Sequence, residues 1–392
     1  MSTTDVTVTD PSAVGVDEAA LARLDAAIQR DIDAKLNYGA SIIVARGGRI
    51  AHRKTFGTVG PDRAAADDDR YLLMSMSKGY VAALTLKAID EGRFGLDTRV
   101  ADLVPGFGVA GKQRATVRHL LTHTAGLPFA LLPPGLPLDK VGDLTAKTRV
   151  ICGLSAEYIP GTRCVYTSAV GYDLLGQLLV NTDPAGRSFR SIVSEDLFAP
   201  LGMNDSSFGV DVDDPRRVLA SATPENSTPM SPLLVNACNT YFTGEAEFPA
   251  GNAFSTIDDV YRFTQLYRGR GTAGGQRLVS PALFDYADRN HTGDLTNDGW
   301  IFETEPRGMD SFPAHFSLLG GYVRGEGHVF NPAGLTASPR TIACVGGGST
   351  SFIVDPERDL TFIFLSAGFF TGLPHLERVS RLNDLALATV ND

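Results

Sequence analysis

The sequence predicts a mixed α/β fold, of the α+β kind, in which one antiparallel sheet is built from both ends of the chain and a mainly helical domain lies between them. Strand-like runs surround a Gly47-Gly48 turn near the N-terminus. Further strand-like runs occur after residue 340, and helical signals dominate from about residue 95 to residue 208. Strands at both ends of a chain, with helices between them, are expected to meet in one sheet.

The elements near the N-terminus follow from spacing and turn chemistry. Residues 17–36 carry apolar side chains at helical spacing, which predicts a helix. The β-rich runs 40–46 and 49–53 on either side of the glycine pair predict a hairpin. The next helix begins near Ser75 and is apolar nearly all round, so we expect it to be buried. It is expected to end at Asp90-Glu91-Gly92, because glycine suits a helix C-terminus.

The middle and late elements are predicted in the same way. Helical spacing occurs in three segments of the middle part, 117–122, 170–180 and 189–197. Residues 127–138 hold too many prolines for a helix, so they predict an extended loop that could wall a pocket. Later strands are expected over 341–345, 351–354 and 360–366, before a final helix over about 374–390.

The chain of 392 residues is longer than a usual single domain. We expect a discontinuous sheet domain formed by residues 15–95 and 240–392. A mainly helical domain would take up residues 96–239, and residues 1–14 would form a flexible N-terminal segment.

The composition places the protein among ordinary globular proteins, with 43% apolar and 20% charged residues. A net charge of −10 argues against nucleic acid or an anionic membrane as a partner, because both are anionic. No apolar segment is long enough to span a bilayer, and the polar N-terminus does not read as a signal peptide. Scattered cysteines without metal-ligand spacing predict reduced thiols in a cytoplasmic protein without a bound metal: Cys152, Cys164, Cys238 and Cys344.

The strongest chemical signal is the pair Ser75 and Lys78. Positions three apart lie on one face of a helix and can touch. A hydroxyl and an amine placed in this way can share a proton, which a serine must lose before it attacks a carbonyl. Burial of the amine would favour its neutral, basic form. The alternative is a serine N-cap followed by a solvated lysine.

A second candidate is Tyr166, which Ser168 follows two residues later. The phenol could relay the proton of the serine if it lies near the lysine. The alternative is a tyrosine packed at the start of a helix, with Ser168 as the N-cap.

A third candidate is the glycine-rich segment at the end of a late strand, where a ligand could approach the backbone closely. One of its free N–H groups, together with the amide of Ser75, could form an oxyanion hole. A flexible turn is the alternative reading. The candidate residues of this segment are Val345, Gly346, Gly347 and Gly348.

Other hydrolase motifs are absent from the sequence. It contains no Gly-x-Ser-x-Gly and no His-Glu-x-x-His, and the histidines are dispersed. The string Gly269-Arg270-Gly271-Thr272-Ala273-Gly274 matches Gly-x-Gly-x-x-Gly, but it follows a helical pattern. We interpret it as a turn between helices.

In this order, these residues resemble the serine β-lactamase and penicillin-binding protein superfamily, on the branch of class C β-lactamases and family VIII carboxylesterases. Ser75-Met76-Ser77-Lys78 matches the Ser-x-x-Lys motif, and Tyr166-Thr167-Ser168 stands where the branch has Tyr-x-Asn. The stretch 117–127 also resembles the branch, and its His123 is expected to pack and to hydrogen-bond a loop. The likeness extends from about residue 15 to residue 385.

The resemblance implies a β-lactamase-like α/β sandwich with the active site between the sheet and the helical domain. It implies Ser75 as the nucleophile, and Lys78 and Tyr166 as the pair that handles its proton. Backbone amides of Ser75 and of the late strand would bind the oxyanion, with neither metal nor organic cofactor.

Two departures from the family pattern bear on the substrate. Ser168 replaces the asparagine that would contact the amide side chain of a β-lactam. The third motif, Lys-Thr-Gly in lactamases, corresponds here to Cys344-Val345-Gly346 or to Val345-Gly346-Gly347, and neither contains a cation. A substrate carboxylate would therefore lack its main electrostatic partner, which favours neutral esters.

The sequence predicts a serine carboxylesterase that acts on a small-molecule ester through an acyl-serine intermediate. A β-lactamase or amidase, an acyltransferase and a non-enzymatic binding relative are the alternatives. Oligomeric state and ester specificity stay open. The region 297–339 contains five aromatic residues that either shape the pocket or pack against the helical domain. They are Trp300, Phe302, Phe312, Phe316 and Tyr322.

Overall fold

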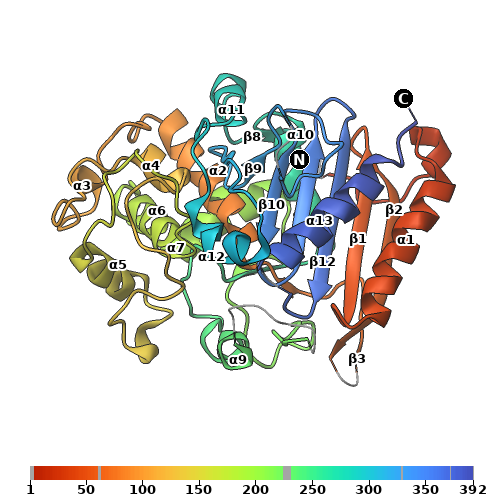
Figure 1. The fold of residues 1–392 in the computed structure, drawn as a ribbon, viewed down its shortest axis with the longest axis horizontal. Helices are drawn as coiled ribbons and strands as arrows, with labels where there is room; N and C mark the ends of the chain where they lie inside the picture. Colours follow the sequence, from red (N-terminus) through yellow and green to blue (C-terminus); the bar gives the residue numbers. More distant parts are fainter. Residues whose placement is uncertain (1–3, 61–62, 224–230, 328–329, 371, 392) are drawn as a thin grey trace.

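The computed structural model describes residues 4–60, 63–223, 231–327, 330–370 and 372–391. Its largest element is a seven-stranded antiparallel sheet with the order β3-β2-β1-β12-β11-β10-β9. Figure 1 shows the sheet on one side of the molecule and the helices of the middle part of the chain on the other. The strands are β1 (Gly39–Arg46), β2 (Arg49–Gly60), β3 (Arg63–Ala64), β9 (Tyr322–Val323), β10 (Ile342–Gly346), β11 (Thr350–Asp355) and β12 (Leu360–Ala367).

The pairing of β1 with β12 confirms that both ends of the chain form one sheet. The two strands run antiparallel along their whole length, from Gly39 opposite Ala367 to Arg46 opposite Leu360. On its other edge β1 pairs with β2 in the predicted hairpin. Both turn glycines, Gly47 and Gly48, have positive φ angles (63° and 71°), a conformation that glycine adopts without a steric penalty.

Both faces of the sheet are covered, because successive side chains of β1 point to opposite sides. Ile42 and Val44 belong to the core shared with the helices α1 (Glu18–Asp33) and α13 (Gly372–Leu387). Ile43 belongs to the larger core, shared with α2 (Ser77–Asp90) and α10 (Ile257–Arg268). In Figure 1 the helix α13 crosses the sheet, and α2 lies between the sheet and the other helices.

The three helices predicted for the middle part are present, and two predicted segments of the chain differ in detail. The segment 189–197 is divided into a short α-helix and a π-helical turn, Ser194–Phe198. Gly269–Gly274 leads from α10 into a small hairpin of β7 (Thr272–Ala273) and β8 (Gln276–Arg277) rather than into another helix. The helices of this part are α3 (Val100–Leu103), α4 (Val117–Leu121), α5 (Leu144–Gly153), α6 (Val170–Asn181), α7 (Phe189–Val193), α8 (Ala199–Leu201) and α9 (Pro232–Tyr241).

The remaining elements connect the sheet to the helical part. A three-stranded sheet with the order β4-β6-β5 lies next to the start of α2. Among the described residues, every helix is too short or too polar to cross a lipid bilayer. The short elements are β4 (Tyr71–Leu72), β5 (Ser207–Phe208), β6 (Ala253–Ser255), α11 (Pro281–Ala287) and α12 (Ile301–Thr304).

The N-terminal segment for which flexibility was predicted contacts the sheet through Val8 and Thr9, and residues 1–3 lie outside the described part. Val8 forms a parallel bridge with Ile50, and the N–H of Thr9 donates to the carbonyl of Ile50 at 2.7 Å. Residues Pro11–Val14 form a 3₁₀ helix with Asp10 as its N-cap. The division into two domains stays a prediction.

We predict that Gly346→Ala destabilises the protein, because an added Cβ would overlap the carbonyl oxygen of Leu73 and the hydroxyl of Thr350. Overpacking of this kind costs about 1–3 kcal/mol of the free energy of unfolding, which urea titration would measure. Gly153→Ala is the matched control, because nothing lies within 4 Å of its added Cβ. Equal stability of the two variants would contradict the tight contact between β10 and the Leu73 backbone.

Candidate active site

Ser75 lies in a 3₁₀ turn, Met74–Met76, directly before α2, rather than in the α-helix that the sequence predicts. The turn is fixed on both sides. The N–H of Leu73 donates to the carbonyl of Ala253, and the carbonyl of Leu73 accepts from the hydroxyl of Thr350 at 2.9 Å. Met74 has a positive φ angle of 46°, which is a strained conformation for a residue with a side chain.

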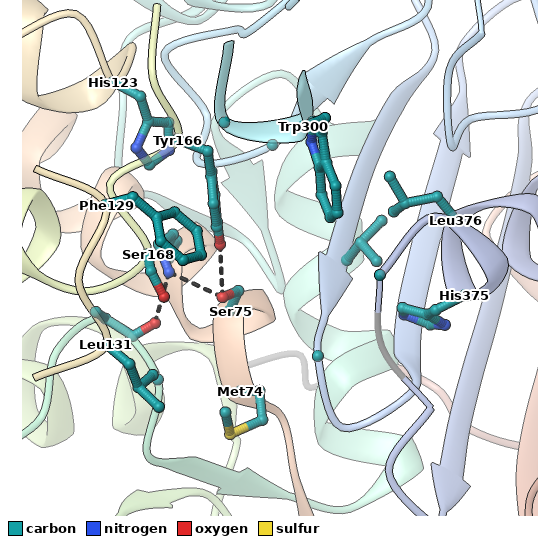
Figure 2. A pocket seen from close by; sticks show the side chains of 18 of the residues that line it. Met74, Ser75, His123, Phe129, Leu131, Tyr166, Ser168, Trp300, His375 and Leu376 are labelled. Carbon is teal, nitrogen blue, oxygen red and sulfur yellow. Dashed lines mark hydrogen bonds between the residues drawn. The ribbon is translucent and has the colours of Figure 1, made fainter. Parts of the chain in front are cut away.

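The structure brings Ser75, Lys78 and Tyr166 into direct contact. The amine of Lys78 donates to Oγ of Ser75 at 2.9 Å, and the hydroxyl of Tyr166 donates to the same oxygen at 2.6 Å (Figure 2). Ser75 and Tyr166 are half-buried, whereas Lys78 is 2% exposed. Two proton-transferring groups therefore converge on one hydroxyl oxygen.

The amine of Lys78 has no carboxylate partner among the residues that the structure describes. It donates instead to the carbonyl of Ala250 at 2.9 Å. The rings of Tyr166 and Tyr172 lie 5.3 Å and 5.6 Å from the amine nitrogen, within the range of cation–π attraction. These contacts hold the amine beside Ser75 through uncharged groups.

Tyr166 is held by His123, whose ring centroid lies 4.6 Å from that of the tyrosine. Two hydrogen bonds to His123 also fix the chain on either side of Tyr166. The backbone carbonyl of His123 accepts from the N–H of Val165, and Nδ1 of His123 accepts from the N–H of Thr167 at 3.3 Å. Burial and the nearby Lys78 hold the pKa of His123 well below its usual value, so its ring is neutral. The predicted loop-holding contact of His123 is thus present in the structure.

Ser168 lines the same pocket but makes no cap for α6. The N-cap position belongs to Ala169, which has no side-chain hydrogen bond, so the N-cap interpretation of Ser168 is wrong. Ser168 has a positive φ angle of 54° and forms a bridge with Ala130 of the proline-rich loop. This bridge ties the loop to the segment that carries Tyr166.

The glycine-rich segment divides into two sets of residues. Val345 and Gly347 line the pocket next to Ser75. Gly346 packs against the Leu73 backbone and accepts a hydrogen bond from Nε2 of His375, while Gly348 packs against Leu72 and Met74. Val345 and Gly347 therefore face the position of a substrate, whereas Gly346 and Gly348 do not.

Among the described residues, the pairing of β10 with β9 stops before Val345. The N–H of Arg324 donates to the carbonyl of Thr341, so Thr341, Ala343 and Val345 turn their backbone groups toward β9. The last pair between these strands is Ala343 with Tyr322. The backbone N–H of Val345 therefore points beyond the end of β9, on the side of the pocket.

The pocket has a volume of about 290 Å³ and a mainly apolar lining. Figure 2 shows His123, Phe129, Leu131 and Tyr166 on one side of Ser75, and Trp300, His375 and Leu376 on the other. The proline-rich loop, predicted to wall a pocket, supplies two residues of this lining. Four of the five aromatic residues left open by the sequence also line it, namely Trp300, Phe302, Phe316 and Tyr322.

The remaining aromatic residue, Phe312, does not line the pocket but belongs to a small apolar cluster with Leu373 and Leu376, with its ring 5.1 Å from that of Phe330. Sequence reasoning missed Ala250, Glu303 and His375, which all line the pocket. No motif marks these residues, because each comes near Ser75 only through the folded chain. Within the described ranges, no cluster of His, Cys, Asp and Glu could hold a metal ion.

The fold and this arrangement of serine, lysine and tyrosine define a class of serine hydrolases. The sequence model of the family described as Beta-lactamase matches residues 24–386. The chain therefore belongs to the β-lactamase family, which confirms the resemblance seen in the sequence. It is a hydrolase of this family.

Two relatives illustrate the range of the family. The chain is 28% identical over 315 residues to "Penicillin-binding protein 4" of Amycolatopsis lactamdurans, covering 77% of this chain and 78% of that protein. It is 31% identical over 217 residues to "Esterase EstB" of Burkholderia gladioli, covering 51% of this chain and 54% of that protein. The chain thus spans about half of the esterase in this match.

Solved structures share the whole fold. A structure described as a family VIII carboxylesterase has a TM-score of 0.72 and 20% identity, covering 95% of this chain and 99% of that chain. A penicillin-binding protein homologue from Caulobacter crescentus has a TM-score of 0.75 and 21% identity, covering 96% and 99%. The predicted fold class is therefore confirmed.

We predict that His375 makes the protein less stable as the pH falls below about 6.5. Burial lowers the pKa of His375 to about 3, so the unfolded chain binds a proton in this range and the folded chain does not. The free energy of unfolding should fall by about 1.4 kcal/mol for each pH unit from this residue alone. Urea titrations of the wild type and His375→Gln between pH 6.5 and 5 would measure the difference.

Glutamine can still donate to the carbonyl of Gly346, which His375 contacts at 3.1 Å, so the variant removes the titration and keeps the bond. Other buried histidines act equally on both proteins. Parallel stability curves for the two proteins would contradict the prediction.

Proposed function

We propose that the protein is a serine carboxylesterase of the family VIII type. The observation that carries this proposal is the convergence of Lys78 and Tyr166 on Oγ of Ser75, at 2.9 Å and 2.6 Å. This geometry suits removal of the proton of the serine and its later delivery to a leaving group. The apolar pocket beside Ser75 suits a neutral organic ester.

In the acylation step, Oγ of Ser75 forms a bond to the ester carbonyl carbon. Its proton passes to the amine of Lys78, directly or through the phenol of Tyr166. The carbonyl π electrons move to oxygen and give a tetrahedral oxyanion. When the oxyanion collapses, the bond from carbon to the alkoxy oxygen breaks, and the same proton leaves with the alcohol. An acyl-serine remains.

The oxyanion requires preorganised hydrogen-bond donors. The amide of Ser75 lies at the start of a helical segment, where its N–H has no partner within the helix. The backbone alternation of β10 directs the N–H of Val345 to the open strand edge, and Gly347, two residues on, lines the pocket as well. We assign the second donor to this pair of residues.

Deacylation repeats the same steps with water. A water molecule loses a proton to the amine of Lys78, directly or through the phenol of Tyr166, and attacks the acyl carbon. The bond from carbon to Oγ of Ser75 then breaks, Oγ takes up the proton, and the carboxylic acid leaves. Neither step requires a redox partner or a cofactor.

Electrostatics of the pocket favour neutral substrates. Among the described lining residues, the only lysine or arginine is Lys78, which already contacts Ser75 and Ala250. Glu303 also belongs to the lining, and burial holds the pKa values of His123 and His375 low enough to keep both neutral. A carboxylate on the substrate would find no free positive partner.

We predict that Ser75→Ala lowers kcat for p-nitrophenyl butyrate by about a thousandfold or more, because the nucleophile is lost. A serine-directed phosphonate should add to Ser75 of the wild type, as peptide mass spectrometry would detect. Ser191→Ala, in a serine that contacts Ser188 near the start of α7, is the matched control and should keep full activity. Undiminished turnover by Ser75→Ala, at unchanged circular dichroism, would refute the mechanism.

We predict a preference for uncharged acyl groups. The kcat/KM for p-nitrophenyl pentanoate should exceed that for p-nitrophenyl hemisuccinate by about tenfold or more. The carboxylate of the hemisuccinate would gain no charge-assisted hydrogen bond in the pocket, and such a bond is worth about 1.5–3 kcal/mol. Steady-state kinetics at low ionic strength would measure this ratio. A ratio near one, or rapid turnover of nitrocefin, would favour the β-lactamase or amidase alternative. Ester products formed with added alcohols would favour acyl transfer.

A further inference from the structure

A buried ion pair lies behind the proposed catalytic lysine, in a position that no sequence motif marks. The amine of Lys147, on α5, contacts Oδ2 of Asp173, on α6, at 2.9 Å. Both side chains are fully buried, at 0% exposure. The amine of Lys147 also lies 3.9 Å from the ring centroid of Phe248.

The second oxygen of Asp173 connects this pair to Lys78. It accepts the backbone N–H of Ala250 at 3.2 Å. The carbonyl of the same residue accepts from the amine of Lys78 at 2.9 Å. A continuous series of contacts therefore leads from Lys147 through Asp173 and Ala250 to Lys78 and Ser75.

Ala250 lies in a tight turn whose other groups are also fixed. The N–H of Gly251 donates to the carbonyl of Phe248 at 2.9 Å, which closes the turn. The N–H of Phe248 donates to the side chain of Asn252 at 3.1 Å. These bonds leave the N–H of Ala250 without a partner in the turn. Asp173 accepts this N–H and thereby fixes the orientation of Ala250.

A buried ion pair is a poor source of stability, because the cost of removing two charges from water offsets much of their attraction. Well-packed apolar residues commonly do as well in such places. The Lys147–Asp173 pair is therefore better explained by the hydrogen bond from Ala250 to Asp173 than by a contribution of the pair to the stability of the fold.

We propose that Asp173 is a positioning residue for the acyl-transfer reaction, with Lys147 as its counter-ion. Asp173 sets the carbonyl of Ala250 at the place where it receives the amine of Lys78, and thereby directs that amine at Ser75. This inference rests on the proposed function. A displaced amine would slow proton transfer from Ser75 and leave the substrate pocket unchanged.

The test compares two double variants that both lose the ion pair. In Lys147→Met with Asp173→Asn, the amide oxygen can still accept the N–H of Ala250. In Lys147→Met with Asp173→Leu, no acceptor remains. We expect the Asn pair to keep kcat for p-nitrophenyl butyrate within about threefold of the wild type. The Leu pair should lose about tenfold or more, with KM nearly unchanged.

The rate constant for phosphonate labelling of Ser75, normalised to folded protein, is the second measurement and should fall with kcat. Lys147→Met with Asp173→Ala serves as the acceptor-free protein if leucine prevents folding. Lys112→Met is the control for loss of a buried lysine, because Lys112 is also 0% exposed but contacts backbone carbonyls in another part of the helical region.

Equal kcat values and labelling rates in the Asn and acceptor-free variants would overturn the proposal. A loss of activity in proportion to the loss of folded protein would overturn it as well. Such a result would leave the proposed function intact if wild-type Ser75 is labelled and active. An unlabelled, inactive wild type would instead refute the proposed function.

Discussion

The structure around the site depends on one constraint, the burial of the Lys78 amine with no carboxylate partner in the described part of the chain. A buried amine must find hydrogen-bond acceptors, because desolvation without compensation costs several kcal/mol. Here the acceptors are the hydroxyl of Ser75 and the carbonyl of Ala250, and two tyrosine rings surround the nitrogen. An amine with so few partners has one chemically reactive neighbour, and that neighbour is the proposed nucleophile.

This constraint explains why segments far apart in the sequence meet at one point. α2 supplies Lys78, and the turn before it supplies Ser75. The segment before α6 supplies Tyr166, and the turn at Ala250 supplies the carbonyl. These segments pack into one large apolar core, so the distances between the reacting atoms are set by packing rather than by local flexibility.

The sequence predicted those parts of the molecule for which local patterns carry the information. Strand runs, glycine turns and helical spacing predicted the β1–β2 hairpin, the late strands and α6 with correct types. The bounds are nearly correct except for β2, which was predicted to end at residue 53 and extends to Gly60. The spacing of Ser75 and Lys78 likewise predicted their contact. It did not predict the 3₁₀ geometry of the turn, because the strain at Met74 depends on tertiary contacts of Leu73.

Other features could not be predicted, for a physical reason. Asp173 and Lys147 look like ordinary helix-surface charges until the packing of α5 on α6 buries both. Ala250 contributes only backbone groups, which any residue other than proline would provide. The division of the glycine-rich segment into pocket-facing and buried residues requires the strand register, which is set by pairing with β9 and β11.

The pairing of β1 with β12 has a consequence for the order of events during synthesis. The central strand pair joins a segment made early to one made near the end, so the sheet cannot close before the ribosome has delivered β12. Until then the hydrophobic faces of β1 and α1 have no permanent cover. A nascent chain of this protein therefore exposes part of this apolar surface for most of its translation.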